Sequence, residues 1–310
     1  MTTIPYPNPD DVAAPVSRIS HLSLKTPRLE AMVRHYTVIL GMTHVGTVGD
    51  TVHLACSDGT PALELSPGDA PSLDHLAFDL HAGVDIDTAA RSFEKLGLSP
   101  ATWEGVAPAD TESLRLTDPD GAVLQIMARK QLYTATSQPH EGIGVKPFKL
   151  GHVASRVDKL SEVIGFYQSG LGFRFSDSIG DDFVFMRCNM DHHSVNFLRV
   201  GAPRHVHHFA FELQDWGHVK LAADELWSYG IGLIWGPGRH GAGHNLFTYH
   251  YDPDGNIVEL FAELDKMSNE GAGVFDWRPW HDGPQYPKRW DPAWPANAPW
   301  GSHPPEKFLF

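Results

Sequence analysis

One carboxylate in this chain stands where an unpaired charge is costly. Glu259 lies between Val258 and Leu260, in an apolar stretch that follows a DPDG turn. A charged group among apolar neighbours needs a cation or hydrogen-bond donors. The chain also holds 19 histidines, against 24 lysines and arginines together. Histidine is the commonest metal ligand and titrates near neutral pH, so the two residue types together indicate metal or acid/base chemistry.

The surroundings of Glu259 occur twice in the sequence. DPDGAVLQI at 118 to 126 matches DPDGNIVEL at 252 to 260, which places Gln125 opposite Glu259. The turn and the apolar pattern are shared, and only the carboxylate differs. The fold therefore does not need an acid at this position, and we interpret Glu259 as a functional residue.

Two histidines repeat at nearly the same interval. SHLSL is echoed by GHVAS, which pairs His21 with His152, and DHLAFDL is echoed by HHFAFEL, which pairs His75 with His208. The second copy thus has two histidines and a glutamate, a set that leaves coordination positions free for substrate and O₂ on non-haem Fe(II). The first copy has a glutamine instead, a poor and neutral ligand. We interpret the two copies as one working metal site and one retired site.

Each copy begins with a short strand carrying the first histidine, followed by a helix that a glycine ends and then by three strands. In the second copy the helix is predicted from Lys159 to Ser169, with Val163, Phe166 and Tyr167 on its apolar face and Gly170 or Gly172 as terminator. The predicted divisions are an N-terminal extension at 1–16, a first domain at 17–130, a linker at 131–147, a second domain at 148–265 and a C-terminal segment at 266–310.

The segment 266–310 holds five of the nine tryptophans and eight of the 24 prolines. It has no helix or strand period, so it cannot form a core of its own. We predict an extended strap whose tryptophans dock on the body or on a neighbouring subunit. Disorder is the alternative, disfavoured because disordered tails are poor in aromatic residues.

Composition excludes several classes of partner. The formal net charge of −14 and the lack of a basic stripe argue against nucleic acid or an anionic membrane. The N-terminus has no cationic start followed by an apolar run, and no segment offers about 18 uninterrupted apolar residues, so a cytoplasmic protein is expected. Only Cys56 and Cys188 are present, which disfavours a disulfide framework or a cysteine-rich zinc site.

A longer motif leads to a family resemblance. The residues that carry this motif are, in order, His240, Tyr249, Asp252, Pro253, Gly255 and Glu259. With them the chain resembles a type I extradiol ring-cleavage dioxygenase of the vicinal oxygen chelate superfamily over about 17 to 265. The resemblance implies an α+β fold of two tandem vicinal oxygen chelate domains, each built from paired βαβββ modules or a repeat of them that form a curved, barrel-like sheet.

The resemblance also implies an activity and its residues. His152, His208 and Glu259 would bind Fe(II), with Mn(II) possible, and no other cofactor is implied. The substrates would be a catechol and O₂. His193 in DHHSVNF matches the family's acid/base histidine, with His192 as the alternative. Tyr249 and His240 would hydrogen-bond the substrate, and members of this family often form homo-oligomers.

Two other functions stay open at this point. A glyoxalase- or epimerase-like metalloenzyme of the same superfamily would typically use two carboxylates among four ligands, and a binding protein without catalysis would usually lack the full ligand set. The formal G-x-G-x-x-G match in GPGRHG is not taken as a dinucleotide site, because Pro237 lies inside it and no helix follows. His244 and His250 are weaker candidates for contacting a substrate substituent such as a carboxylate.

Overall fold

The computed structural model describes most of the chain. The described residues are 15–103, 112–128, 144–201, 205–269, 276, 288–292, 299–306 and 308. Most of the predicted linker at 131–147 and much of the segment at 266–310, with Trp277, Trp280 and Trp294, lie outside these ranges, as does nearly all of the extension at 1–16. Among the described helices, none is both long and apolar enough to span a membrane.

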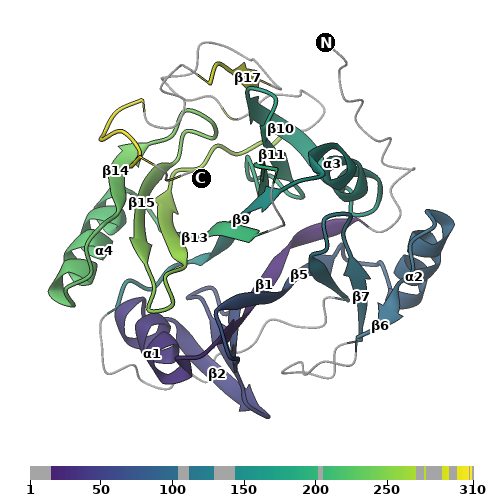
Figure 1. The fold of residues 1–310 in the computed structure, drawn as a ribbon, viewed down its shortest axis with the longest axis horizontal. Coiled ribbons are helices and arrows are strands. Elements are labelled where there is room, and N and C mark those ends of the chain that lie inside the picture. The colour runs from purple at the N-terminus through teal and green to yellow at the C-terminus, as the bar shows by residue number, and fades with distance from the viewer. Residues whose placement is uncertain are drawn as a thin grey trace.

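Two mixed sheets form the molecule (Figure 1). Module one, residues 16–127, contains β1 (Val16–Thr26), α1 (Leu29–Arg34), a π-helical turn (His35–Ile39), β2 (Thr43–Val48), β3 (Thr51–Ala55), β4 (Pro61–Pro67), β5 (Ser72–Leu80), α2 (Ile86–Lys95), β6 (Ala101–Thr102), β7 (Ser113–Thr117) and β8 (Val123–Met127). Its strand order is β2-β3-β4-β1-β5-β8-β7-β6.

Module two, residues 149–262, repeats this plan. It contains β9 (Lys149–Val157), α3 (Leu160–Ser169), β10 (Arg174–Ile179), β11 (Phe183–Arg187), β12 (Val195–Arg199), β13 (His205–Glu212), α4 (Trp216–Ser228), β14 (Trp235–Arg239), β15 (Leu246–Tyr251) and β16 (Ile257–Ala262). The strand order is β14-β15-β16-β13-β9-β12-β11-β10, and β17 (Lys288–Trp290) adds to β10.

Each module consists of two βαβββ units in succession, which confirms the paired arrangement expected. The first strand of each unit lies parallel to its last strand, and the two first strands pair antiparallel at the centre of the sheet. The predicted helix near 159–169 is α3, which ends at Gly170. The helices α2 and α4 were not anticipated; aspartates cap both, as Asp85 accepts a bond from the Thr88 amide and Asp215 one from the His218 amide.

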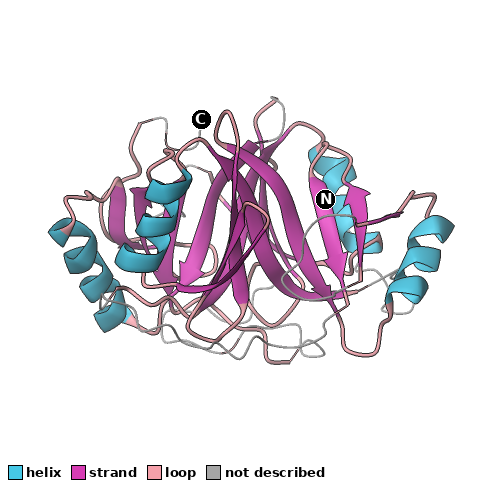
Figure 2. Ribbon diagram, turned by 90° about the horizontal axis from the view of Figure 1, so that it is seen from below, coloured by secondary structure: helices cyan, strands magenta, loops and turns pink. Residues whose placement is uncertain are grey.

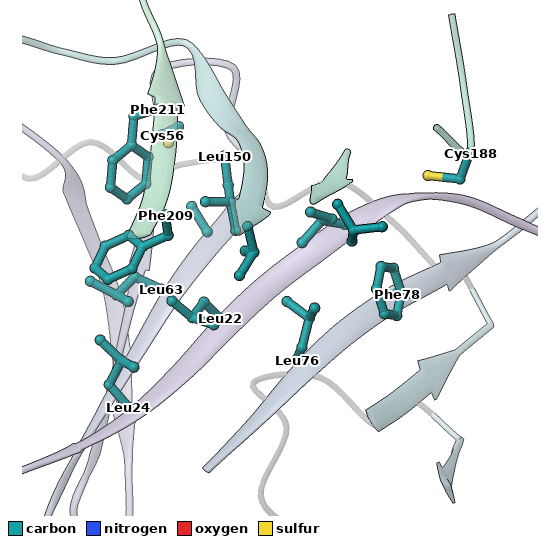
Figure 3. Packing of buried hydrophobic residues seen from close by; sticks show 14 of the residues in the cluster. Leu22, Leu24, Cys56, Leu63, Leu76, Phe78, Leu150, Cys188, Phe209 and Phe211 are labelled. Carbon is teal, nitrogen blue, oxygen red and sulfur yellow. The ribbon is translucent and has the colours of Figure 1, made fainter. Parts of the chain in front are cut away.

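The helices lie at the flanks and the strands fill the centre of the molecule (Figure 2). One continuous apolar core runs through both modules. Figure 3 shows where they meet, with Leu22 and Leu63 of module one close to Leu150 and Phe209 of module two. Fully burying such a side chain contributes about 1.5–3 kcal/mol. Because side chains alternate along a strand, the residues next to these apolar ones face the other side of each sheet.

The described parts of the C-terminal segment pack on module two. β17 pairs with β10, and the Trp290 side chain on it is buried against Phe185 and Ala242. Further on, Trp300 pairs with Arg239 at the end of β14, and Phe308 packs on Trp235 and Tyr249. These contacts agree with a docked strap, as far as the segment is described.

Candidate metal centre

The strand register of module two brings its predicted ligands together. Ala210 on β13 lies opposite His152 on β9 and also opposite Glu259 on β16. His208 lies two residues before Ala210 on the same strand, so its side chain projects from the same face of the sheet. Three neighbouring strands therefore each contribute one side chain to one point.

The converging atoms are close enough to share one ion. His152 Nε2 lies 3.0 Å and His208 Nε2 3.2 Å from Glu259 Oε2, and the two nitrogens are 3.3 Å apart. Ligand atoms bound at about 2.1 Å and at right angles around one metal lie about 3.0 Å apart. The three atoms are thus close enough to be ligands of one metal ion.

The hydrogen bonds behind His208 fix which of its nitrogens carries a proton. The Phe308 carbonyl oxygen accepts from His207 Nε2 at 2.6 Å, so His207 Nδ1 accepts from His208 Nδ1, also at 2.6 Å. Burial lowers the pKa of His207 to about 3, which keeps it neutral. In a neutral His208 the Nε2 lone pair then points at an oxygen of Glu259. Two lone pairs at this distance repel unless a cation lies between them, so the donor set fits a metal ion.

Glu259 is ionised although it is fully enclosed. Burial alone would raise its pKa, but the neighbouring imidazoles of His152 and His208 hold the pKa well below the usual range. Asn245 Nδ2 donates to Glu259 Oε1 at 2.9 Å and orients the carboxylate. Burial lowers the pKa of His208 by more than Glu259 raises it. The lowered pKa favours the neutral imidazole that a metal requires.

A pocket opens onto this cluster. Its empty volume is about 490 Å³, counting its mouth. Its apolar and aromatic walls come from strands of module two and from the C-terminal segment, and they are formed by Ile179, Phe183, Phe185, Trp235, Ala242, Pro304 and Phe308. The polar groups that face it include His193, His240 and Tyr249. A few directed polar groups inside an apolar wall are typical of a site for a small aromatic molecule.

His193 and His192 take different positions. His193 lines the pocket, with its ring edge against His152 at a centroid distance of 4.3 Å. His192 lies behind it, where its Nδ1 is 3.0 Å from His193 Nδ1 and its Nε2 is 3.0 Å from Asp177 Oδ2. Because a carboxylate only accepts, His192 donates to Asp177 through Nε2 and accepts from His193 through Nδ1. This leaves Nε2 as the basic nitrogen of His193.

Tyr249 and His240 form a pair on the other side of the carboxylate. Tyr249 lies directly opposite Glu259 in the strand register, which explains why it reaches the same face. His240 Nε2 is 2.9 Å from Tyr249 Oη and 3.7 Å from Glu259 Oε1, and its ring stacks on Phe247. Burial, together with the charge of Glu259 and a hydrogen bond to it, raises the pKa of Tyr249 well above its usual value, so the phenol keeps its proton.

The structure does not place the two weaker candidates in this pocket. His244 has a backbone φ of +51° and directs Nδ1 to Asp265 Oδ2 at 2.7 Å, outside the pocket wall. His250 follows Tyr249 on β15, and because strand side chains alternate it faces away from the pocket. It is buried against His35 of module one instead, with the Nε2 atoms 3.3 Å apart. Neither residue is among the described residues that line the pocket, so the structure gives no support to their contact with a substrate substituent.

The histidine pair between the modules makes stability depend on pH. Burial lowers the pKa of His35 to about 4 and that of His250 well below its usual value. Between pH 6.5 and 4 these histidines bind protons in the unfolded chain but stay neutral in the folded protein. The free energy of unfolding therefore decreases as the pH is lowered, by up to about 1.4 kcal/mol per pH unit for each histidine. Urea unfolding at pH 7, 6 and 5 should show a shallower loss for His35→Asn than for the wild type. An equal slope would contradict this, and the exposed His44→Asn is the control.

Several site residues were not found in the sequence. Asn245 orients the ligand carboxylate, Trp235 stacks on Tyr249 at an interplanar angle of 9°, and Phe308 closes one wall. Asn245 stands beside the His240 motif and could have been noticed there. Phe308 comes from the end of the chain, and no local pattern connects it to a pocket formed by β13 and β15.

Known proteins are similar to this chain in sequence. Residues 149–260, which span module two, match the Glyoxalase/Bleomycin resistance protein/Dioxygenase superfamily model. The chain is 28% identical over 274 residues to a manganese-dependent 2,3-dihydroxybiphenyl 1,2-dioxygenase of Geobacillus genomosp. 3, covering 81% of this chain and 86% of the relative. It is 26% identical to metapyrocatechase 2 of Cupriavidus necator, covering 87% and 91%.

Solved structures show the same fold. A substrate complex of homoprotocatechuate 2,3-dioxygenase from Brevibacterium fuscum has a TM-score of 0.81 at 20% identity, covering 98% of this chain and 95% of that one. A Mn(II)-bound glyoxalase from Novosphingobium aromaticivorans has a TM-score of 0.76 at 24% identity, covering 94% and 93%. The tandem vicinal oxygen chelate fold predicted from the sequence is thereby confirmed. Residues 149–260 thus match a domain of the Glyoxalase/Bleomycin resistance protein/Dioxygenase superfamily.

Proposed function

We propose that the protein is an extradiol ring-cleavage dioxygenase, which inserts both atoms of O₂ into a catechol beside the vicinal diol, and that module two is its active site. One observation carries the proposal. Two imidazoles and one carboxylate converge in an aromatic pocket, while His193 and the Tyr249–His240 pair face the same space. The product is a ring-opened compound of the 2-hydroxymuconic semialdehyde type.

His152, His208 and Glu259 hold the metal, Fe(II) or Mn(II). When bound, the metal supplies adjacent coordination positions for the diol oxygens and O₂, together with a path for electrons between them. Glu259 contributes one negative charge, and Asn245 keeps its carboxylate in place. The hydrogen bonds through His207 to Phe308 keep the His208 ring in the tautomer that a metal needs.

His193 moves the protons of the reaction. Its Nε2 is the basic nitrogen, since Nδ1 is committed to His192, and its ring borders both the pocket and His152. Burial keeps its pKa well below the usual value, so it begins as a neutral base. It can take a proton at Nε2 from the substrate and return it to a product oxygen.

Tyr249 and His240 orient the substrate. The phenol of Tyr249 keeps its proton and can donate a hydrogen bond to a diol oxygen, while His240 sets the direction of that hydroxyl from behind. The rings of Trp235 and Phe308 hold Tyr249 in place and exclude water from this side. A fixed orientation of this kind lowers the activation barrier, because the entropy of orienting the substrate is lost on binding and not in the chemical step.

The pocket walls predict a preference among catechols. No lysine or arginine is among the described residues that line it, and its one carboxylate is Glu259. A carboxylated catechol would bring a second negative charge without a partner, which is costly in an apolar site. We expect kcat/KM for 3-alkylcatechols or 2,3-dihydroxybiphenyl to exceed that for 3,4-dihydroxybenzoate by at least about 10-fold. A carboxylated catechol as the best substrate would contradict this.

The activity itself is tested with the metal-loaded protein. Samples reconstituted anaerobically with Fe(II) or with Mn(II) are mixed with each catechol, O₂ is admitted, and the absorbance of the yellow ring-opened product is followed. Product formation with one of the two metals supports the proposal and identifies the working metal. If metal analysis shows a bound ion and no catechol gives product, the proposal fails.

A further inference from the structure

Module one contains a second cluster of the same composition. His21 Nε2 lies 3.2 Å from Glu64 Oε1 and 3.2 Å from His75 Nε2, and His75 Nε2 lies 3.7 Å from Glu64 Oε2. All three side chains are buried. The carboxylate comes from β4 and not from β8, where Gln125 is bonded to Ser113.

The strand register of this cluster reproduces that of module two. Ser23 on β1 lies opposite Glu64 on the parallel strand β4 and opposite His75 on the antiparallel strand β5, and His21 lies two residues before Ser23. In module two, Ala210 stands in the place of Ser23, between a carboxylate on a parallel strand and a histidine on an antiparallel one. The two βαβββ units of a module are alike, so the same constellation can be built on the first unit or on the second. Module one uses its first unit and module two its second.

The outer nitrogens of both histidines are already engaged. His75 Nδ1 lies 2.9 Å from Asp74 Oδ2, and Asp74 is in turn paired with Lys25. Since a carboxylate only accepts, His75 donates through Nδ1, and the Nε2 lone pair of the neutral ring points toward Glu64 and His21. His21 Nδ1 is 3.3 Å from the Ser20 hydroxyl. Histidines that bind metals commonly have their second nitrogen held by such a carboxylate or hydroxyl.

A fourth histidine faces the carboxylate. His53 on β3 lies opposite Glu64 in the register, as Tyr249 lies opposite Glu259 in module two. Its Nδ1 is 3.1 Å from Glu64 Oε1 and its side chain is buried. The position that carries a phenol in the proposed active site thus carries another nitrogen donor in module one.

We propose that module one binds a second divalent transition-metal ion through His21, Glu64 and His75. Two imidazole nitrogens with one carboxylate favour zinc, manganese, iron or cobalt over magnesium or calcium, which prefer oxygen ligands. The ligands are enclosed and His53 can complete the set, which is the character of a structural site. The ion stabilises module one, and the interpretation of this module as a retired site, drawn from Gln125 alone, is replaced.

The number of ions per chain tests this without any measurement of turnover. Metal-free protein is reconstituted with Zn(II) or Mn(II), desalted, and analysed by native mass spectrometry and by elemental analysis. We expect two ions per chain for the wild type, one for Glu259→Gln and one for Glu64→Gln, with none for the double variant. Glu259→Gln with its one ion bound should have a higher melting temperature than the same variant without metal. The exposed His44→Gln is the control and should keep both ions.

One ion per wild-type chain, or no ion on Glu259→Gln, would overturn the proposal. Both measurements stand even if Glu64→Gln does not fold, because neither uses that variant. Two ions on a folded Glu64→Gln, checked by circular dichroism, would also overturn it, since the second ion would then lie elsewhere. The count uses no catechol, so a failure of the proposed dioxygenase activity would leave the result intact.

Discussion

Glu259→Gln should remove the metal from module two and lower ring-cleavage kcat/KM by at least about 10³-fold. The carboxylate is the one anionic ligand among the three, and it is buried between two neutral imidazoles. An amide brings no charge and binds these metals weakly. Loss of several kcal/mol of metal-dependent stabilisation of the transition state corresponds to a rate loss of this order.

The variant is expected to fold, because the chain already contains its counterpart. Gln125 lies opposite Ala77 in module one as Glu259 lies opposite Ala210 in module two, and the sheet accommodates the amide there. Metal content and steady-state kinetics of the reconstituted variant check the prediction, with the exposed Glu94→Gln as the matched control. Retained metal in module two together with wild-type turnover would show that the ligand assignment is wrong.

The repeat explains why this part of the site could be predicted from sequence. When two copies of one fold carry different residue types at the same position, the fold does not require either type. Such a position is a candidate for function. The Glu259 and Gln125 pair was such a position, and the paired histidines followed from nearly the same offset. The structure brings His152, His208 and Glu259 to one point, because the register depends on the βαβββ topology that the repeat implied.

The same comparison concealed the cluster in module one. Aligning module one with module two pairs Gln125 with Glu259, both on the last strand of the second βαβββ unit. The carboxylate of module one, Glu64, stands instead on the last strand of the first unit. Its counterpart by register in module two is Asn196, which lies opposite Ala154 as Glu64 lies opposite Ser23. Finding Glu64 requires recognising the second repeat inside each module, which a comparison of one module with the other does not reveal.

Other features depend on contacts that no local pattern encodes. Phe308 reaches the pocket from the C-terminal segment, and its carbonyl fixes the tautomers of His207 and His208. The pairing of His250 with His35 depends on how the two modules pack. The direction of His250 was nevertheless available from the sequence, because the residue after Tyr249 on a strand must face the other side of the sheet.

His193→Phe should lower kcat by about 10²–10⁴-fold while module two keeps its metal. The expected loss is that of a general acid/base group. Phenylalanine fills the space of the imidazole against His152 and Phe185 but cannot carry a proton. Elemental analysis, native mass spectrometry and kcat together check the prediction. Loss of the metal would show instead that His193 belongs to the ligand set.

His192→Phe separates proton transfer from positioning. His192 accepts from His193 Nδ1 and donates to Asp177, whose other oxygen accepts the Lys288 amide. Without that acceptor, His193 is no longer held with its proton on Nδ1, and Nε2 loses its fixed basic role. We expect a smaller fall in kcat, about 10-fold, accompanied by a changed dependence of kcat on pH. A purely structural role for His192 would instead lower the activity equally at every pH.

For His193→Phe the acid/base group itself is absent, so its contribution to the pH profile should disappear. If His192→Phe instead produced the larger loss with the metal retained, the acid/base function would belong to His192, the alternative that the adjacent histidines left open in the sequence.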